Sequence, residues 1–397
     1  MPIQLSNEEF ARRRARIAKE MADRKLDALC LFSSTQIFYL TGFAFLATER
    51  PIGVIFVPGR NHIHLFVPLL EQEHAATAQV DDVRTYVEYP DVVHPMEAFA
   101  GLLEELGVAS LRVGVDGDGY GGGYGYIGPR LSKLVSGKIV ASRDLIEQMM
   151  WIKSDEEIAL IRESCRWGEL AHRYLQQYSV AGSLETDVSV GASQRASTEM
   201  ITVLGPKFRA SRSGSFPARA GFRGQIGPDS AVPHALTSNT RLQAGDVLVT
   251  GAAAEVGGYL SELERTMILG KPTEKQARYF ELMVAVQDLA FNEIRPGRTC
   301  AEVDRPVRAF YKEHGIEGTW RHHTGHGIGY GMHESPFLDI GDDTLIVPGM
   351  VLTVEPGIYI PGFAGFRHSD TVLVKAEGNE RLTLYPRDLA ALSLPIS

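Results

Sequence analysis

The sequence predicts an α+β protein with a smaller N-terminal α/β domain over residues 1–150 and a larger domain over residues 151–397. Apolar runs typical of strands alternate with helical stretches through the first part, which indicates α/β packing. Near Trp151 the pattern changes, because a long amphipathic helix is predicted to begin after Ser154. Helices and antiparallel strands follow it, and this order favours an α+β arrangement.

The first domain is predicted to open with an amphipathic helix over Asn7–Lys25, where apolar residues recur at helical spacing. Further helical stretches are expected at Leu69–Ala78 and Pro95–Leu106. The segment Gly117–Gly128 is dense in Gly and Tyr and is interpreted as a loop. Buried strands are predicted at Leu26–Phe32, Pro51–Val57, His62–Val67 and Leu111–Val115.

The helix that opens the second domain carries a capping signature, because Ser154 can cap it and Glu157 stands three residues on. The segment Gly205–Gly227 contains Gly, Ser and Arg but no acid, so a solvated loop and a mobile flap holding an anionic group both remain open. Helices are predicted over Glu274–Ile294 and Cys300–Glu313, and strands at Val247–Thr250, Met350–Val354 and Thr371–Val374.

The composition excludes several classes of function. A formal net charge of −9 argues against a general nucleic-acid partner or an anionic membrane surface. No apolar run approaches the roughly 20 residues that a membrane span needs. Three scattered cysteines cannot build a disulfide framework, and the N-terminus lacks a signal-peptide pattern. These features predict a cytoplasmic protein.

The strongest chemical signal is Arg321–Pro336, in which His322, His323, His326 and His333 are interleaved with glycines. Glycine lets a ligand approach the backbone closely. Imidazoles bind metals or carry protons near neutral pH. We interpret the stretch as the lining of an active cleft, and the alternative is a His-rich turn packed for structural reasons.

Three further clusters carry possible chemistry. His234 follows Pro233, and taken alone it is more often a structural histidine. Glu262 and Glu264 stand at alternate positions, so an extended backbone points both to one face. Glu355 lies inside an apolar strand, where a buried carboxylate requires a cation or hydrogen-bond donors.

Together these motifs resemble the pita-bread family, which holds aminopeptidase P, prolidase, methionine aminopeptidase and creatinase. The resemblance implies a C-terminal domain of two pseudo-symmetric halves around a curved sheet, and a homodimer. It covers the whole chain, because Tyr39-Leu-Thr-Gly-Phe43 and Ile152-Lys-Ser-Asp-Glu-Glu-Ile158 also match. The other segments that carry it are Thr324-Gly-His-Gly-Ile-Gly, His333-Glu-Ser-Pro, Val354-Glu-Pro-Gly and Arg367-His-Ser-Asp370.

Peptidases of this family bind two divalent metals through Asp, Asp, His, Glu and Glu. When this ligand pattern is carried over to the present sequence, the His corresponds to His326 and the first Glu to Glu355. The two Asp positions are occupied by Gly251 and Glu262, and the final Glu position by Ser369. Only two acids then remain at the ligand positions, which is too little negative charge for two divalent ions. We therefore predict no metal and no cofactor.

The metal-free creatinase branch then matches better, because Leu263-Glu-Arg-Thr266 is similar to a creatinase segment. The resemblance implies that Glu264 and Glu355 bind a cationic substrate and that His234 is the general base and acid. The prediction is a metal-independent hydrolase of a carbon–nitrogen bond in a small zwitterionic amidine or guanidino compound, like creatinase or ectoine hydrolase.

The remaining predicted roles follow from the same resemblance. His326 is placed with the catalytic residues, and Glu262, Arg265 and His333 with the substrate-binding residues. Arg50 is expected to reach across a homodimer to the substrate carboxylate, at a site near the subunit interface. Two alternatives stay open: a metal-dependent Xaa-Pro peptidase-like hydrolase with an altered site, such as one metal at Glu262, His326 and Glu355, and a non-catalytic binding protein.

Overall fold

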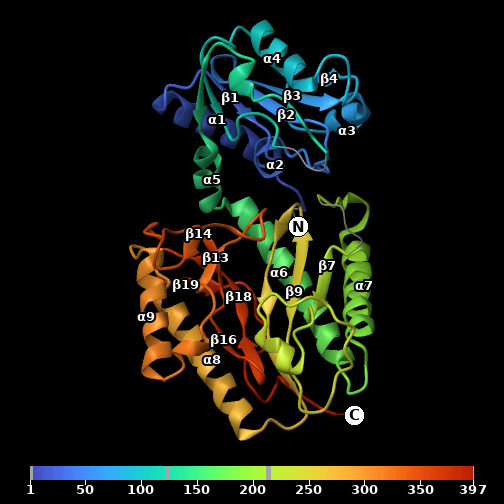
Figure 1. The fold of residues 1–397 in the computed structure, drawn as a ribbon, viewed down its shortest axis with the longest axis vertical. Coiled ribbons are helices and arrows are strands. Elements are labelled where there is room, and N and C mark those ends of the chain that lie inside the picture. Colours follow the sequence, from blue (N-terminus) through green and yellow to red (C-terminus); the bar gives the residue numbers. More distant parts are fainter. Residues whose placement is uncertain (1–2, 122–124, 212–215, 397) are drawn as a thin grey trace. The chain divides into compact units, whose positions relative to one another are not determined.

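The structure is a computed structural model that describes residues 3–121, 125–211 and 216–396. The chain folds into two compact units, one essentially Leu5–Met150 and the other formed mainly by the chain from Trp151 onward (Figure 1). Among the described residues, no helix is long and apolar enough to cross a membrane.

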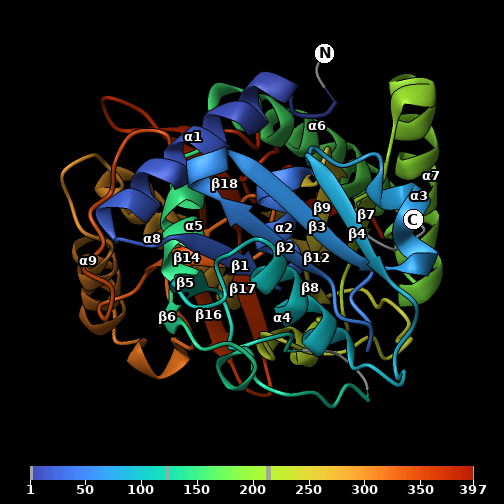
Figure 2. The same ribbon diagram turned by 90° about the horizontal axis from the view of Figure 1, so that it is seen from above.

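The N-terminal unit is built on a sheet of order β4-β3-β2-β1-β5-β6, and Figure 2 shows β1 to β4 running side by side. β2 pairs antiparallel with β1 and β3. The other pairs are parallel: β4 with β3, β5 with β1, and β6 with β5. The strands are β1 (Ala28–Leu31), β2 (Gly53–Val57), β3 (His62–Pro68), β4 (Asp82–Tyr86), β5 (Arg112–Val115) and β6 (Lys138–Ala141). The helices are α1 (Asn7–Asp23), α2 (Ser34–Thr41), α3 (Gln72–Ala75), α4 (Pro95–Glu105) and α5 (Arg143–Trp151).

The predicted buried strands of this unit are confirmed as β1, β2, β3 and β5. The helix predicted over Leu69–Ala78 is shorter than expected, because only a 3-10 turn and the single turn of α3 form. The sequence analysis missed α2 and β4. Four of the five residues of β4 are only partly buried or exposed, so this strand carries no apolar run that the sequence could reveal. Part of the predicted Gly117–Gly128 loop lies outside the described residues, and the rest has no helix or strand.

The C-terminal unit is built on an antiparallel sheet of order β10-β9-β11-β18-β15-β13-β14, with β7 beside β9 and β19 beside β18. Its strands are β7 (Ala218–Gly221), β9 (Gly251–Val256), β10 (Tyr259–Leu260), β11 (Leu263–Glu264), β13 (Gly325–Gly327), β14 (Glu334–Leu338), β15 (Val351–Val354), β18 (Ser369–Val374) and β19 (Asn379–Arg381). Smaller sheets join β8 (Val247–Val249), β12 (Thr266–Leu269) and β20 (Ser393–Leu394), and β16 (Gly357–Ile360) with β17 (Ala364–Arg367).

Two helix pairs cover this sheet (Figure 1). α6 (Asp155–Tyr178) and α7 (Glu185–Leu204) pack on the β7–β9 half. α8 (Glu274–Glu293) and α9 (Cys300–Glu313) pack on the half that contains β14 and β15. The predicted α+β class is therefore confirmed. The cap of α6 is confirmed as well, because Ser154 and Glu157 form a reciprocal capping box.

The predicted loop Gly205–Gly227 is not entirely a loop. Ala218–Gly221 forms β7 beside β9, with Ala218 and Ala220 buried and Arg219 exposed between them. Small alternating residues give a weak strand signal, so the sequence analysis missed it. Arg212, one of the basic residues of the proposed flap, lies outside the described residues.

His172 on α6 gives the C-terminal unit a predictable response to acid. It is fully buried, and its Nε2 lies 2.7 Å from Thr250 Oγ1. Burial, and secondly the charge of Arg265, lower the pKa of His172 to about 3. Because the pKa of His172 is lower in the folded protein, the unfolded chain takes up a proton first on acidification. The contribution of neutral His172 to the free energy of unfolding is therefore complete above about pH 6.5 and is lost as the pH falls towards 3.

In His172→Gln the free energy of unfolding should fall less steeply on acidification, by roughly 1.4 kcal/mol per pH unit below pH 6.5. Urea unfolding followed by tryptophan fluorescence measures it, because Trp151, Trp167 and Trp320 all lie in the C-terminal unit. The exposed His314 provides the control as His314→Gln. Equal acid sensitivity of the two variants would show that His172 is not the cause.

Candidate functional site

Carboxylates and imidazoles gather where β11, β13, β15 and β18 meet. Glu262 directly precedes β11, His326 is the middle residue of β13, and Glu355 follows β15. Three carboxylate oxygens, one each from Glu262, Glu264 and Glu355, lie within 4.8 Å of one another. Three ligand atoms, one each from Glu262, His326 and His333, also lie within 4.8 Å of one another. We call Glu262, Glu264, His326, His333 and Glu355 the acid–imidazole cluster. Glu262 and Glu264 thus meet in one place, as their alternate spacing predicted.

Backbone packing dictates where His326 lies. Gly325 is required beside it, because a Cβ there would fall 2.0 Å from the Thr353 carbonyl oxygen of the neighbouring strand. A register shift between His326 and Gly327 then interrupts the pairing of β13 with β14. Such bulges redirect side chains near functional sites.

One nitrogen of the His326 ring is held by the backbone, and the other faces carboxylates. Its Nδ1 lies 2.9 Å from the Gly327 carbonyl oxygen and donates to it. Its Nε2 is buried and faces two carboxylates, because it lies 3.1 Å from Glu355 Oε1, within ion-pair distance, and 4.0 Å from Glu262 Oε2. A ligating histidine is usually oriented in this way, by a hydrogen bond at its other nitrogen.

The cluster concentrates negative charge in a buried place. Burial, followed by the charges of Glu355 and Glu264, raises the pKa of Glu262 to about 8. Burial opposes ionisation of Glu355, but the nearby His326 outweighs it and holds the pKa of Glu355 below its usual range. Burial also lowers the pKa of His326, and Glu355 and Glu262 overcome this and raise it to about 9.

These residues fit one divalent metal ion. Two carboxylates and an imidazole form an open ligand set that leaves positions for water or substrate. Ser369 adds no carboxylate, and its Oγ donates to Glu262 Oε1 at 2.7 Å. Gly251 leaves space, because a Cβ there would have only Glu264 Oε1 within 4 Å, at 3.5 Å.

Glu264 cannot grip a substrate cation as predicted, because the chain fills that role itself. Arg367 binds the carboxylate of Glu264 with two nitrogens: Nε donates to Oε2, and Nη2 donates to Oε1 at 2.7 Å. Arg223 Nη2 also donates to Oε1, at 3.2 Å. The sequence analysis assigned no role to Arg367, and it included Arg223 only among the basic residues of the possible flap at Gly205–Gly227. The one available signal was that Arg367 opens the Arg367-His-Ser-Asp370 motif.

Arg265 cannot take the predicted substrate-binding role either, because it is 0% exposed. Its guanidinium pairs with Asp370 at 2.8 Å. All three of its side-chain nitrogens donate within the protein, and their further acceptors are the carbonyl oxygens of Glu264, Ser369, Tyr385 and Pro386. Arg265 is therefore a structural residue.

The other predicted residues have these positions. His333 is exposed and stacks on His326, with ring centroids 3.9 Å apart. Burial, followed by the proximity of His326, lowers the pKa of His333, and His234 contributes to the same effect. His234 itself is exposed. Arg50 belongs to the N-terminal unit, where it pairs with Glu49 and, at 2.7 Å, with Glu88.

His322 and Tyr359 extend the cluster, and the sequence analysis gave Tyr359 no role. The Tyr359 hydroxyl accepts a hydrogen bond from Arg367 Nη1 at 2.9 Å and lies 2.8 Å from His322 Nε2. The side chain of Tyr359 is fully buried. It therefore connects the histidine stretch to the Glu264–Arg367 pair.

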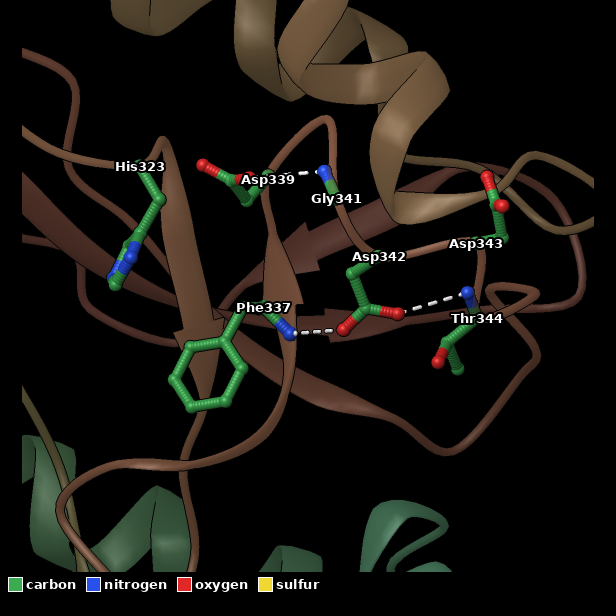
Figure 3. Close-up of a pocket in the computed structure, with 7 residues that line it drawn as sticks. All are labelled: His323, Phe337, Asp339, Gly341, Asp342, Asp343 and Thr344. Atoms are coloured by element: carbon green, nitrogen blue, oxygen red, sulfur yellow. Dashed lines mark hydrogen bonds between the residues drawn. The ribbon is translucent and has the colours of Figure 1, made fainter.

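An open pocket of about 720 Å³ lies beside His323, whose ring centroid is 5.9 Å from that of His326. Figure 3 shows that two of its three aspartates brace the surrounding loop. Asp342 accepts from the backbone N–H groups of Phe337 and Thr344, and Asp339 accepts from that of Gly341. Asp339 also pairs with Arg308 at 2.7 Å.

A buried ion pair supports the loop that carries His333. Lys153 Nζ lies 2.8 Å from Glu334 Oε2, with side-chain exposures of 2% and 8%. Lys153→Met leaves the Glu334 carboxylate buried and uncompensated, so we expect the free energy of unfolding to fall by about 3–5 kcal/mol. Chemical denaturation measures this. The double variant Lys153→Met/Glu334→Gln removes both charges and should recover most of the loss, whereas equal losses would mean that the pair is not the cause.

Two family models match the chain. Residues 159–376 match metallopeptidase family M24, and residues 13–149 match the creatinase/prolidase N-terminal domain. The chain belongs to metallopeptidase family M24. The Xaa-Pro dipeptidase of Pyrococcus horikoshii is 29% identical over 376 residues, which are 94% of this chain and 97% of that protein. The probable dipeptidase PepE of Mycobacterium tuberculosis is 28% identical over 98% of both chains.

Solved structures agree with this assignment. The prolidase from Pyrococcus horikoshii has a TM-score of 0.78 at 27% identity, covering 95% of this chain and 99% of that one. The Xaa-Pro dipeptidase from Bacillus anthracis has a TM-score of 0.79 at 26% identity, covering 96% and 99%. The predicted pita-bread family and fold are therefore confirmed.

The predicted metal-independent, creatinase-like function is wrong. The relatives are named Xaa-Pro dipeptidases and dipeptidases, within a metallopeptidase family. The prediction counted only Glu262 and Glu355 as charge available to a metal. It left out Glu264, which lies in the same cluster, and it could not show that the buried Nε2 of His326 faces Glu262 and Glu355.

Proposed function

We propose that the protein is a metal-dependent hydrolase of small dipeptides of the Xaa-Pro type, with one divalent ion held by Glu262, His326 and Glu355. The observation that carries this proposal is the buried Nε2 of His326, which lies 3.1 Å from a carboxylate oxygen of Glu355 and 4.0 Å from one of Glu262. The names of the relatives support the substrate class. The same open ligand set supports one ion, because Gly251 and Ser369 contribute no carboxylate.

When bound, the ion supplies a Lewis acid that polarises the scissile carbonyl. The Gly327 carbonyl holds the His326 ring in place, and the Ser369 hydroxyl orients Glu262. Burial and the proximity of His326 lower the pKa of His333, which favours its neutral form. Its imidazole accepts a proton from the attacking water and returns it to the leaving nitrogen. His234 is the second proton carrier on this side of the cluster.

Arg223 supplies a positive charge for the substrate carboxylate. Its side chain is 50% exposed and its Nη2 lies 3.2 Å from Glu264 Oε1, beside the cluster. Its backbone has a φ of 53°, a left-handed conformation that non-glycine residues adopt rarely. A guanidinium with one exposed edge can bind a carboxylate through charge-assisted hydrogen bonds.

We also propose a homodimer, with Arg50 near the subunit interface. Val87, Val92 and Ile127 of the N-terminal unit are 71%, 98% and 83% exposed. Tyr89 joins their segments, because its hydroxyl accepts from the Ile127 N–H at 2.7 Å. Exposed apolar groups gathered in this way are typical of interaction sites. Light scattering should show a dimer that Val92→Asp/Ile127→Asp converts to a monomer, and a monomeric parent protein would exclude the proposal.

The function is tested on the full chain before and after treatment with a chelator. We expect the metal-loaded protein to cleave Ala-Pro and Gly-Pro, the chelated protein to be inactive, and one equivalent of Mn²⁺, Co²⁺ or Zn²⁺ to restore activity. Creatine is the control substrate and should not be hydrolysed. Undiminished turnover by the metal-free protein would exclude the metal-dependent mechanism, and ion binding without dipeptide cleavage would exclude the substrate class.

A further inference from the structure

Two histidines outside the acid–imidazole cluster lie side by side on β3 of the N-terminal unit. His62 and His64 occupy alternate positions of the strand, so their side chains point to the same face of the sheet, whereas Ile63 points to the other. The centroids of the two imidazole rings are 4.7 Å apart. His64 is 5% exposed and His62 is partly buried, so solvent reaches the pair from the His62 side.

The carboxylate beside His64 decides which of its nitrogens is available to an ion. Nδ1 of His64 lies 3.1 Å from Oδ2 of Asp82, which is its direct partner on the neighbouring strand β4. An ionised carboxylate only accepts hydrogen bonds, so Nδ1 carries the proton and the lone pair of the neutral ring lies on Nε2. Metal-ligating histidines are usually oriented by a carboxylate in this way.

The Nε2 atom of His64 is buried and has no hydrogen-bond partner among the residues that the structure describes. Buried polar atoms are nearly always partnered, and an exception calls for a water molecule, an ion or a functional reason. The ring of His62 brings a second nitrogen lone pair to the same place. Two imidazoles on one face of a strand can share one metal ion after small rotations of their side chains, so the pair favours an ion over a water molecule.

The charged groups bonded together around His64 leave room for a cation. Asp82 also accepts from Nε of Arg84, whose guanidinium pairs with Glu105 at 2.8 Å. The adjacent Asp81 is balanced by Arg14 at 3.1 Å. Three acids therefore stand against two arginines, which leaves one negative charge beside two imidazoles. A divalent ion is attracted by this remaining charge.

We propose that His62 and His64 form a second metal site, which binds a divalent transition-metal ion of the Zn²⁺ or Ni²⁺ type. Nε2 of His64 and one nitrogen of His62 are the protein ligands, and water fills the other positions. Imidazole nitrogens suit these ions, at distances of roughly 2.0–2.1 Å for zinc. Asp82 is a positioning residue, because it orients His64 without ligating the ion. The site lies in the N-terminal unit and does not depend on the proposed peptidase function.

The test counts ions on the chelator-treated full chain without a histidine tag, by equilibrium dialysis against Ni²⁺ with elemental analysis. We expect His62→Ala/His64→Ala to bind one ion fewer than the parent protein. The acid–imidazole cluster is the same in both proteins, so the difference counts the β3 site alone, whether or not the cluster binds Ni²⁺. Equal numbers of ions in the parent and in the folded double variant would overturn the inference.

A single variant keeps the inference testable if the double variant does not fold, which circular dichroism would show. His62→Ala removes one of the two ligands from a partly buried position, so we expect the affinity of this site for Ni²⁺ to fall at least about tenfold. Calorimetric titration measures it, and unchanged affinity would also overturn the inference.

His74→Ala is the matched control. Nδ1 of His74 makes a similar contact, 3.0 Å from Glu71 Oε2, but its ring lies against Phe43 instead of a second imidazole. This variant should bind as many ions as the parent protein and with the same affinity. A loss of the ion in His74→Ala equal to that in His62→Ala would show that Ni²⁺ binds surface histidines without selectivity, and would exclude the β3 site.

Discussion

Replacement of His326 by alanine is expected to lower the affinity for the divalent ion by on the order of a thousandfold, and dipeptide turnover with it. His326 is the only imidazole of the proposed ligand set, and its buried Nε2 faces Glu262 and Glu355. Changes to residues that merely orient a metal ligand lower affinity about 10- to 100-fold, so loss of the ligand itself should have a larger effect. Calorimetric titration of the chelator-treated protein measures the affinity, and kcat/KM for Ala-Pro measures the activity.

The control for this experiment is His314→Ala, because His314 is exposed on the surface. It should keep the affinity and activity of the parent protein. Circular dichroism should show that His326→Ala retains its fold, since an alanine fits wherever the imidazole did. Affinity for the ion equal to that of the parent would show that His326 is not a ligand.

Replacement of Arg265 by methionine is expected to reduce the free energy of unfolding by about 3–5 kcal/mol. The substitution removes the nearer cation of the Asp370 carboxylate, which is 0% exposed, and leaves only Arg387, whose Nε lies 3.9 Å away. It also removes the donors for the carbonyl oxygens of Glu264, Ser369, Tyr385 and Pro386. Urea unfolding followed by tryptophan fluorescence measures the loss.

Arg223→Met is the matched comparison, because this guanidinium is 50% exposed and pairs with Glu264 at 3.2 Å. We expect it to change the free energy of unfolding by less than about 1 kcal/mol, as for other exposed ion pairs. It should instead raise KM for dipeptides, since Arg223 is the proposed carboxylate anchor. If Arg265→Met raised KM and left stability unchanged, the structural role assigned to Arg265 would be wrong.

Local patterns in the sequence predicted much of the fold. Ser154 and Glu157 predicted the start of α6, because capping depends on residues three positions apart. Gly-rich and His-rich motifs identified the family and placed His326 and Glu355 in one site. Strand β4 was missed, since an edge strand needs no continuous apolar run. Strand β7 was missed because alanines form its buried face.

The predictions for Glu264 and Arg265 were wrong for a different reason. Glu264 and Arg265 are adjacent in the sequence, but their side chains lie on different sides of the strand. Glu264 belongs to the acid–imidazole cluster, whereas Arg265 lies in the core and pairs with Asp370. Alternation along a strand accounts for the change of side. It does not reveal which distant residue satisfies each charge.

The sequence by itself determined the family and the fold class, because these depend on residue identity at fixed spacing. Only the tertiary structure decided the charge left for a metal ion. Arg367 follows Glu264 by 103 positions in the chain, yet binds both of its carboxylate oxygens. Electrostatic energies depend on distances in space and on burial, and neither can be counted along the sequence.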